Sequence, residues 1–322
     1  MKLLLIVVLA LAALYAGYWV VASRGLDRGL RSGIAAAEAQ GWQIDSASLT
    51  TGGFPSRFDV TARDLTVTSP SGGLVWQTPW VETAALSYRP NKVIAVFAPT
   101  QSIQIGRQTV AVDSDGLRAS AAVAPNTALS FTNLTAEAQR LSLGFDGGAT
   151  VTTGKALLAL RALAPQDNTY ELFLSLDEIR PAVSLPGLPD GAARLTTDAT
   201  AVLDRPLDRT TILPSRPAVT GLTLNSLDLT WGDLRLTGSG AVDVDAAGLP
   251  DGEITVKAEG WDRLIDLLAT TGVIAPQAVQ GVRSMAGMMV RDGALTLPLT
   301  FANGLMAMGP IPLGPAPVIR LP

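Results

Sequence analysis

Hydrophobic and polar positions follow different periods along the chain, and the first feature is an unbroken apolar run. Leu3 to Ala22 holds 20 residues without a charge or a proline. At about 1.5 Å of rise per residue, a helix of that length is about 30 Å long and crosses the hydrocarbon core of a bilayer. Tyr15, Tyr18 and Trp19 near its end are typical of the aromatic belt at a membrane interface. The pattern predicts a membrane anchor or signal over residues 1–23.

A cleaved signal peptide is the alternative for this segment. Val20 and Ala22 fit the small-residue pattern that precedes a cleavage site, here at Ser23. Cleavable signals usually have an apolar core of about 7–15 residues, so the longer run favours a retained anchor. The arginines from Arg24 to Arg31 would by charge alone keep their side of the membrane inside. We nevertheless expect the body outside, because a first apolar segment this close to the N-terminus usually acts as an export signal.

A second helical stretch follows the anchor. Leu26, Leu30, Ile34 and Ala37 recur at spacings of three and four residues, which places them on one face of a helix. The pattern predicts that the membrane helix continues as a helical stalk over residues 24–41.

From Trp42 onward the period changes to two, as in β-strands. Phe58, Val60 and Ala62 alternate with polar residues, the phase slips at Arg63-Asp64, and the alternation then resumes. A slip of this kind indicates a turn or a bulge, because one extra residue would otherwise turn the apolar set outward. We count about 15 candidate strands at the short spacing of all-β structures. These segments predict a mainly β fold of meandering antiparallel hairpins.

Prolines interrupt this pattern near the middle of the chain. Six of them lie between residues 181 and 217: Pro181, Pro186, Pro189, Pro206, Pro214 and Pro217. Because proline cannot donate to a strand ladder, the region is expected to be edge strand, loop or linker. The prediction is a proline-rich seam over 181–217 between an N-terminal β half (42–180) and a C-terminal β half (218–322).

Two short helices are predicted inside the C-terminal half, near residues 261–289. Trp261 to Thr271 has a leucine-rich face that ends at Gly272, and Pro276 begins a second helix with several methionines on one side. Met-rich faces sometimes form adaptable binding surfaces, although ordinary core packing is the more common explanation. The candidate residues of an apolar groove or helix face are Leu264, Leu268, Val282, Met285 and Met289.

Composition excludes several classes of chemistry. The 322 residues include no Cys and no His. The chain therefore has no disulfides, no thiol nucleophile, no Ser-His-Asp triad and no His or Cys metal ligands. The net charge is −4 and the basic residues are scattered, so we expect no nucleic-acid partner.

Carboxylates and lysines are the remaining candidates for catalysis. Paired acids occur at Asp243 with Asp245 and at Asp177 with Glu178, and glycoside hydrolysis needs two carboxyl groups about 5–9.5 Å apart. We expect both pairs to lie on solvent faces or strand ends, where acids solubilise. The body lysines, Lys92, Lys155 and Lys257, would need an apolar pocket for Schiff-base chemistry. The prediction is no enzyme, with no catalytic residue, cofactor or metal site.

Several segments together carry a family resemblance. They are the aromatic-ended anchor, Gly52-Gly-Phe-Pro-Ser-Arg-Phe-Asp-Val60, Ser87-Tyr-Arg-Pro90, and a closing block from Gly240 through Leu295-Thr-Leu-Pro-Leu299 to Leu313. Over most of its length the chain resembles the domain-of-unknown-function family 2125 of bacterial envelope proteins, and more distantly it is similar to AsmA-like envelope proteins. The resemblance implies an inner-membrane anchor, a periplasmic body of curved β-sheet with an apolar groove, and a part in moving phospholipid or maintaining the outer envelope. It supplies no catalytic residues.

Pattern and resemblance together give one expected architecture and three functional hypotheses. The expected fold is mainly β: a long curved antiparallel sheet, or sheets, with an N-terminal membrane helix and a short C-terminal helical pair. The leading hypothesis is a non-enzymatic protein, anchored in the inner membrane with its body in the periplasm, that holds lipid acyl chains between the sheet and the helices. The alternative is an envelope scaffold that binds a protein partner through a sheet edge. A carboxylate hydrolase is the remote third hypothesis.

Overall fold

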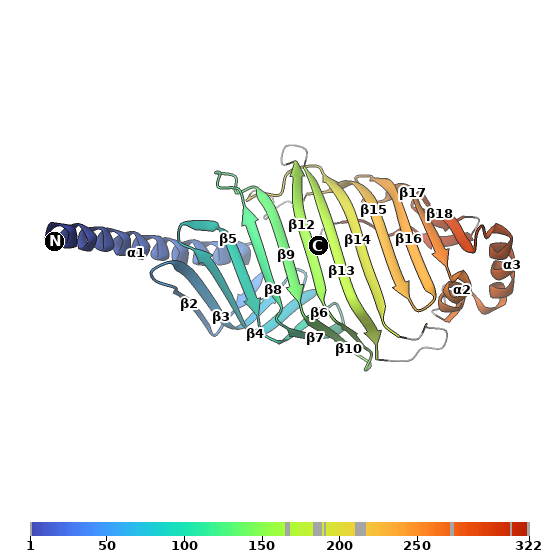
Figure 1. Cartoon of the computed structure of the whole chain (residues 1–322), viewed down its shortest axis with the longest axis horizontal. Coiled ribbons are helices and arrows are strands. Elements are labelled where there is room, and N and C mark those ends of the chain that lie inside the picture. Colours follow the sequence, from blue (N-terminus) through green and yellow to red (C-terminus); the bar gives the residue numbers. More distant parts are fainter. Residues whose placement is uncertain are drawn as a thin grey trace.

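The computed structural model describes residues 2–164, 168–182, 189, 191–209, 217–270, 274–309 and 311–320. A long helix begins the chain, one antiparallel sheet forms most of the body, and short helices lie at the far end (Figure 1). The helices are α1 (Lys2–Glu38), α2 (Trp261–Thr270), the 3-10 turn η2 (Pro276–Ala278) and α3 (Val279–Met289). This architecture confirms the predicted mainly β fold with an N-terminal apolar helix and a C-terminal helical pair.

The described residues contain twenty strands in a single sheet. The strands are β1 (Gln43–Asp45), β2 (Ser48–Gly52), β3 (Arg57–Thr68), β4 (Leu74–Leu86), β5 (Arg89–Phe97), β6 (Thr100–Ile105), β7 (Gln108–Asp115), β8 (Arg118–Val123), β9 (Phe131–Ala138), β10 (Arg140–Phe145), β11 (Thr150–Thr153), β12 (Ala156–Ala164), β13 (Thr169–Pro181), β14 (Ala193–Leu203), β15 (Val219–Trp231), β16 (Leu234–Val244), β17 (Pro250–Glu259), β18 (Ala294–Ala302), β19 (Leu305–Met308) and β20 (Ile311–Pro315). With about 4.8 Å between neighbouring strands, the sheet extends about 50 Å from β3 to β18.

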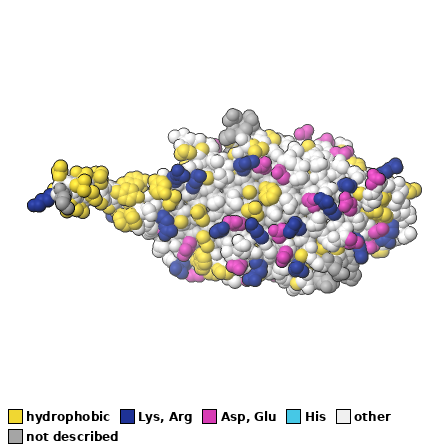
Figure 2. Space-filling view, in the orientation of Figure 1, with side chains coloured by type: hydrophobic (Ala, Val, Ile, Leu, Met, Phe, Trp, Pro, Cys, Tyr) yellow, Lys and Arg dark blue, Asp and Glu magenta, His cyan; other side chains and the backbone are white. Residues whose placement is uncertain are grey.

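Helix α1 is continuous from the apolar run into the predicted stalk. Its half-buried positions include Leu26, Leu30, Ile34 and Ala37, the stripe that the sequence predicts, and this part of α1 contacts β1 and β2. The second half of the helix therefore lies along the body and does not hold it at a distance. The physical reason is that the apolar stripe of the helix is removed from water when it packs on the sheet. The first half is exposed and projects from the body as a rod of hydrophobic side chains (Figures 1 and 2).

Several long strands are bent at one common line, which we call the crease. The chain breaks its strand pattern at Ala98, Gly116, Gln139 and Gly154, which separate β5 from β6, β7 from β8, β9 from β10 and β11 from β12. The two sets of half-strands diverge after β4 and rejoin at β13. At the crease the backbone of Asp64 adopts a φ of 48° inside the continuous strand β3, whose pairing with β4 has no register shift, so the phase slip at Arg63-Asp64 is a bend in the strand and the predicted turn or bulge is wrong.

The crease keeps the apolar side chains on one face of the sheet. Apolar positions advance by three residues where they cross it, for example from Ala62 to Leu65 and from Ala138 to Leu141. A slip in one strand alone would turn its apolar set to the opposite face, but here neighbouring strands slip at the same line. Trp76 and Phe97, on opposite sides of the crease, accordingly remain in ring contact with centroids 6.2 Å apart.

The opposite face of the sheet is polar. Cross-strand ion pairs lie along it: Arg118–Glu137, Arg161–Glu171, Arg194–Asp177 and Arg235–Asp228. Figure 2 shows basic and acidic side chains interspersed over the body in this view. Because such exposed pairs each contribute about 1 kcal/mol or less, they favour solubility and pairing register more than stability.

Much of the apolar face has no second layer over it. A C-terminal segment with Ala316 and Ile319 packs on one part of it, and α2 and α3 cover another. Leu158 and Leu172, near the middle of the sheet, are each 36% exposed. The chain exposes 18574 Å², whereas a compact monomer of 33.4 kDa is expected to expose about 12,600 Å². The projecting helix accounts for part of this excess, and the open face of the sheet for another part.

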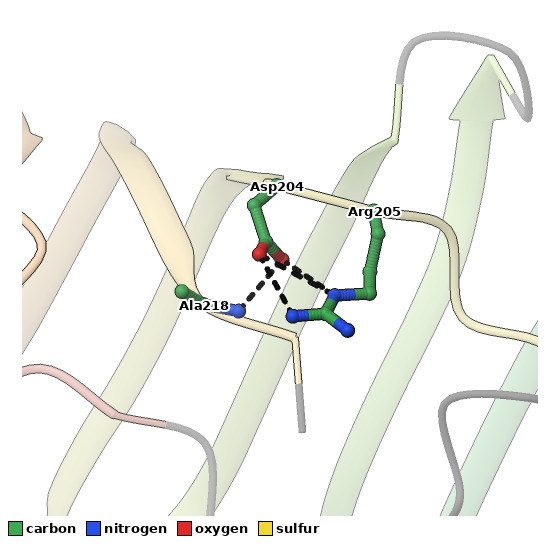
Figure 3. A network of polar contacts seen from close by, with 3 residues as sticks. All are labelled: Asp204, Arg205 and Ala218. Carbon is green, nitrogen blue, oxygen red and sulfur yellow. Dashed lines mark hydrogen bonds and ion pairs between the residues drawn. The ribbon is translucent and has the colours of Figure 1, made fainter. Parts of the chain in front are cut away.

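The predicted seam at 181–217 lies partly outside the described residues. Its described part includes β14, which pairs with β13 on one side and β15 on the other, so the sheet continues through this stretch. Asp204 joins the two ends of the β14–β15 connection (Figure 3): it accepts a hydrogen bond from Ala218 N–H at 2.8 Å and lies 3.2 Å from the guanidinium of Arg205. The Ala218 N–H, and then Arg205, hold the pKa of the Asp204 carboxyl below its usual value.

We predict that Asp204→Asn makes the free energy of unfolding fall less between pH 7 and pH 3 than it does in the wild type. A lowered pKa contributes stability above the unfolded-state pKa of about 3.9, and this contribution is lost as pH falls through the lower folded-state pKa. The expected loss at pH 7 is about 1 kcal/mol or less, because the pair is largely exposed. Urea unfolding of the detergent-solubilised protein at pH 7 and pH 3 measures the two free energies of unfolding, and Asp251→Asn on β17 is the control. Equal acid sensitivity in the wild type and Asp204→Asn would contradict the prediction.

Candidate functional site

The aromatic residues of α1 bind the β body. The Tyr15 hydroxyl donates to Pro55 O at 3.0 Å, and the Tyr18 hydroxyl donates to Ser87 O at 3.0 Å. Trp19 Nε1–H donates to Arg57 O at 2.8 Å. The sequence predicts these three side chains as a membrane-interface belt, and the structure shows that they dock α1 on the sheet.

Two turns receive the helix, and both lie in the segments that carry the family resemblance. The β2–β3 turn holds Phe54 edge-on to Trp19 at 5.3 Å, and Phe58 at the start of β3 stacks on the same indole at 6.0 Å. The β4–β5 turn supplies Ser87, which is 1% exposed and whose hydroxyl lies 2.8 Å from that of Tyr15. Gly53 has a φ of 98°, and a Cβ there would lie 2.8 Å from Arg57 O, so the first turn requires glycine.

One row of directly paired residues runs from β3 to β19 on the apolar face of the sheet. It starts at Phe58, beneath Trp19, and every member is apolar or glycine. We call it the apolar row: Phe58, Ala85, Val93, Ala121, Leu134, Leu160, Leu172, Ala199, Leu224, Gly240, Ile254, Leu299 and Met308. The row therefore connects the docked anchor with the far end of the sheet.

A groove of about 430 Å³ lies at the anchor end of the sheet. We call it the proximal groove, and its lining includes Arg57, Leu86, Arg89, Lys92, Ile94 and Asn133. Its volume lies within the range of about 300–1,000 Å³ that is typical of ligand sites. Aliphatic walls with cationic side chains at the edge suit an amphiphile that has an anionic head.

The far end of the sheet holds a smaller space, the distal cavity, under α2 and α3. All five residues predicted from the sequence line it together: Leu264, Leu268, Val282, Met285 and Met289. Met308 of the apolar row also contributes to the lining. The volume is about 50 Å³, room for a few water-sized probes and far below that of an acyl chain. In this conformation the volume favours core packing, the alternative that the sequence leaves open for these residues.

One member of each acidic pair is engaged in local structure. Asp245 accepts hydrogen bonds from Ala247 N–H and Leu249 N–H, both at 2.8 Å, and so closes the β16–β17 turn. Asp177 pairs with Arg194 at 2.8 Å on the polar face. Among the described residues, no group of three or more His, Cys, Asp or Glu side chains is placed to hold a metal ion.

The three body lysines are placed differently from one another. Lys92 lies at the proximal groove, Lys155 is exposed next to the crease, and Lys257 pairs with Glu259 at 3.1 Å on β17. Sequence reasoning missed the groove residues Arg57 and Arg89. A signal for them existed, because each lies inside a segment that carries the family resemblance.

The apolar run of α1 also satisfies the length and hydropathy of a membrane span. Helix α1 contains a window of mean hydropathy 2.4 and lies near the N-terminus, which a signal sequence would also do. By these criteria it is the only such helix in the part of the chain that the structure describes.

Comparison with known proteins gives one match. A family model described as "Uncharacterized protein conserved in bacteria (DUF2125)" matches residues 19–317. No curated protein and no solved structure matches the chain.

We predict that removing the Trp19 side chain loosens the anchor from the body. Trp19→Phe loses the hydrogen bond to Arg57 O, worth about 1 kcal/mol, and Trp19→Ala also loses the ring contacts, worth about 2 kcal/mol more. The measurement is the rate of tryptic cleavage after Arg24, Arg28 and Arg31 in the detergent-solubilised full chain. If cleavage follows local opening, this rate should rise roughly fivefold in Trp19→Phe and roughly a hundredfold in Trp19→Ala. Val21→Ala, at a position 70% exposed on the same helix, is the control. Cleavage of Trp19→Ala at the wild-type rate would show that the docking contributes nothing.

Proposed function

The chain belongs to the DUF2125 family of uncharacterized bacterial proteins, and we propose that it is a membrane-anchored, lipid-binding protein of the bacterial envelope. In this proposal α1 spans the inner membrane, the β body lies in the periplasm, and the protein acts by binding and not by catalysis. The part in handling phospholipid that an AsmA-like resemblance implies agrees with it.

The apolar row is the observation that carries the proposal. The row begins at the helix that we propose as the membrane anchor, and its middle, where Leu172 is 36% exposed, offers apolar contact to an acyl chain. Each Å² of apolar surface left in water costs about 25 cal/mol relative to burial. A face whose central leucines are more than a third exposed therefore gains free energy when an apolar ligand covers it.

The two spaces support different roles. The proximal groove has the volume of a ligand site and cationic side chains, but Arg57, Lys92 and Ile94 alternate with row members along β3 and β5 and therefore lie on the face opposite to the apolar row. The distal cavity is nearly filled by its own methionine and leucine side chains. We therefore propose that lipid lies along the sheet from the anchor end and that α2 and α3 close the far end.

We predict that p-benzoylphenylalanine in place of Leu172 forms photo-crosslinks to phospholipid in native membranes. Leu172 lies in the middle of the apolar row, several strands away from the anchor, so lipid around α1 does not reach it. Ser175, on the same strand and the polar face, is the matched control position. Mass spectrometry of the adducts should find phospholipid at position 172 and none at 175.

A charge in the row provides a second arm of the experiment. Leu172→Glu places a carboxylate against the acyl chain, so lipid adducts at a crosslinker placed at Leu158 should fall by about fivefold or more. Adducts to a protein at position 172, with no lipid, would overturn the proposal in favour of a scaffold that binds an envelope protein. Absence of any adduct at both positions would also overturn it.

A further inference from the structure

The docked part of α1 leaves too little free helix to cross a bilayer. Tyr15 is the first residue of α1 that hydrogen-bonds to the body, so the free apolar segment runs from Leu3 to Leu14. Twelve residues of helix rise about 18 Å, whereas the hydrocarbon core is about 30 Å thick. A tilt shortens the projection further, and therefore cannot make up the difference.

The edge of the body beside α1 has the side chains of a membrane interface. Phe54 is 56% exposed and Tyr88 is 69% exposed, in the two turns that contact Tyr15 and Trp19. Leu86, next to Ser87, is also exposed. We call Phe54, Leu86 and Tyr88 the apolar rim. Exposed aromatic side chains at one level, next to an apolar helix, are typical of the headgroup region of a bilayer.

Cationic side chains lie immediately behind the apolar rim. Arg57, Arg89 and Lys92 are all exposed around the proximal groove. Arg57 pairs with Asp59 at 3.1 Å, whereas Arg89 and Lys92 have no ion pair within 4.0 Å among the described residues. An anionic leaflet attracts such side chains, so the charges complement phosphate at the depth just outside the rim.

We propose that the apolar rim inserts into the leaflet on the body side of the membrane, with Arg89 and Lys92 against anionic lipid headgroups. The inserted depth, about 12 Å, is the difference between the free length of α1, about 18 Å, and the thickness of the hydrocarbon core, about 30 Å. The body then stands on the bilayer with α3 at the end away from it (Figure 1). This inference concerns the membrane contact of the body and does not depend on the proposed lipid binding along the apolar row.

Because the chain has no cysteine, a single introduced thiol reports depth at one position. The full-length protein carrying Tyr88→Cys, labelled with an environment-sensitive fluorophore, is reconstituted in vesicles of phosphatidylcholine with phosphatidylglycerol. Lipids spin-labelled near the top of the acyl chain should quench this label. Met288→Cys on α3, at a position 79% exposed, is the control and should stay unquenched.

Lengthening the helix tests the cause. Seven apolar residues inserted between Leu14 and Tyr15 add about 10.5 Å and close to two full turns, so the docking face is kept while the body is lifted. Quenching at Tyr88 should then fall to the level of Met288. Quenching that is already at that level in the unmodified chain, or that is unchanged by the insertion, would overturn the inference.

Charge reversal tests the headgroup contact separately. In vesicles that contain phosphatidylglycerol, Arg89→Glu with Lys92→Glu should lower the quenching of the label at position 88 by roughly tenfold or more, because the anionic headgroups then repel the rim. Quenching in pure phosphatidylcholine should stay unchanged. Arg235→Glu with Lys257→Glu, on the polar face of β16 and β17, is the matched control for charge. Equal effects of the two double variants would show that Arg89 and Lys92 do not contact the headgroups.

Discussion

The strict two-residue period of β-strands is the constraint on which the rest of this structure depends. Every residue added to a strand turns the following side chains to the other face, so an apolar face that crosses many strands survives only if neighbours change phase together. The crease meets this requirement, because the strands bend at one line and keep their pairing register on both sides. A bent sheet with one apolar side results, and the apolar row is its direct consequence.

That constraint also explains which parts of the fold the sequence predicts. Alternation within a strand is local, so segments such as Tyr170 to Leu176 and the slip at Arg63-Asp64 are visible in the chain itself. Register between strands is not local: nothing near Leu172 indicates that Ala199 is its partner across the ladder. The sequence therefore predicts strands and an apolar side, whereas the continuous row needs the pairings. The central strand β14 was hidden for a related reason, because flanking prolines suggested a seam where the sheet continues.

The candidate sites divide in the same way. The five residues at the distal cavity are recognisable because helical periodicity gathers them on facing helix surfaces, and they do come together. Periodicity cannot tell whether such a surface encloses space or fills it, and the volume of about 50 Å³ depends on side-chain packing. The proximal groove could not be predicted at all from pattern. Arg57 and Arg89 come from different turns, and only the antiparallel pairing of β3, β4 and β5 brings them to one end of the sheet.

The aromatic residues of α1 show how one set of side chains satisfies two environments. Tyr and Trp have an apolar body and a polar tip, which suits a bilayer interface and equally suits docking on exposed backbone carbonyls. Here the hydroxyls and the indole N–H bind carbonyl groups of the two turns, while the Trp19 ring meets Phe54 edge-on and stacks on Phe58. Those turns bear exposed apolar side chains themselves, so in the membrane contact that we propose the docking surface and the membrane interface coincide. The proposed contact would hold the start of the apolar row at the depth where lipid acyl chains begin.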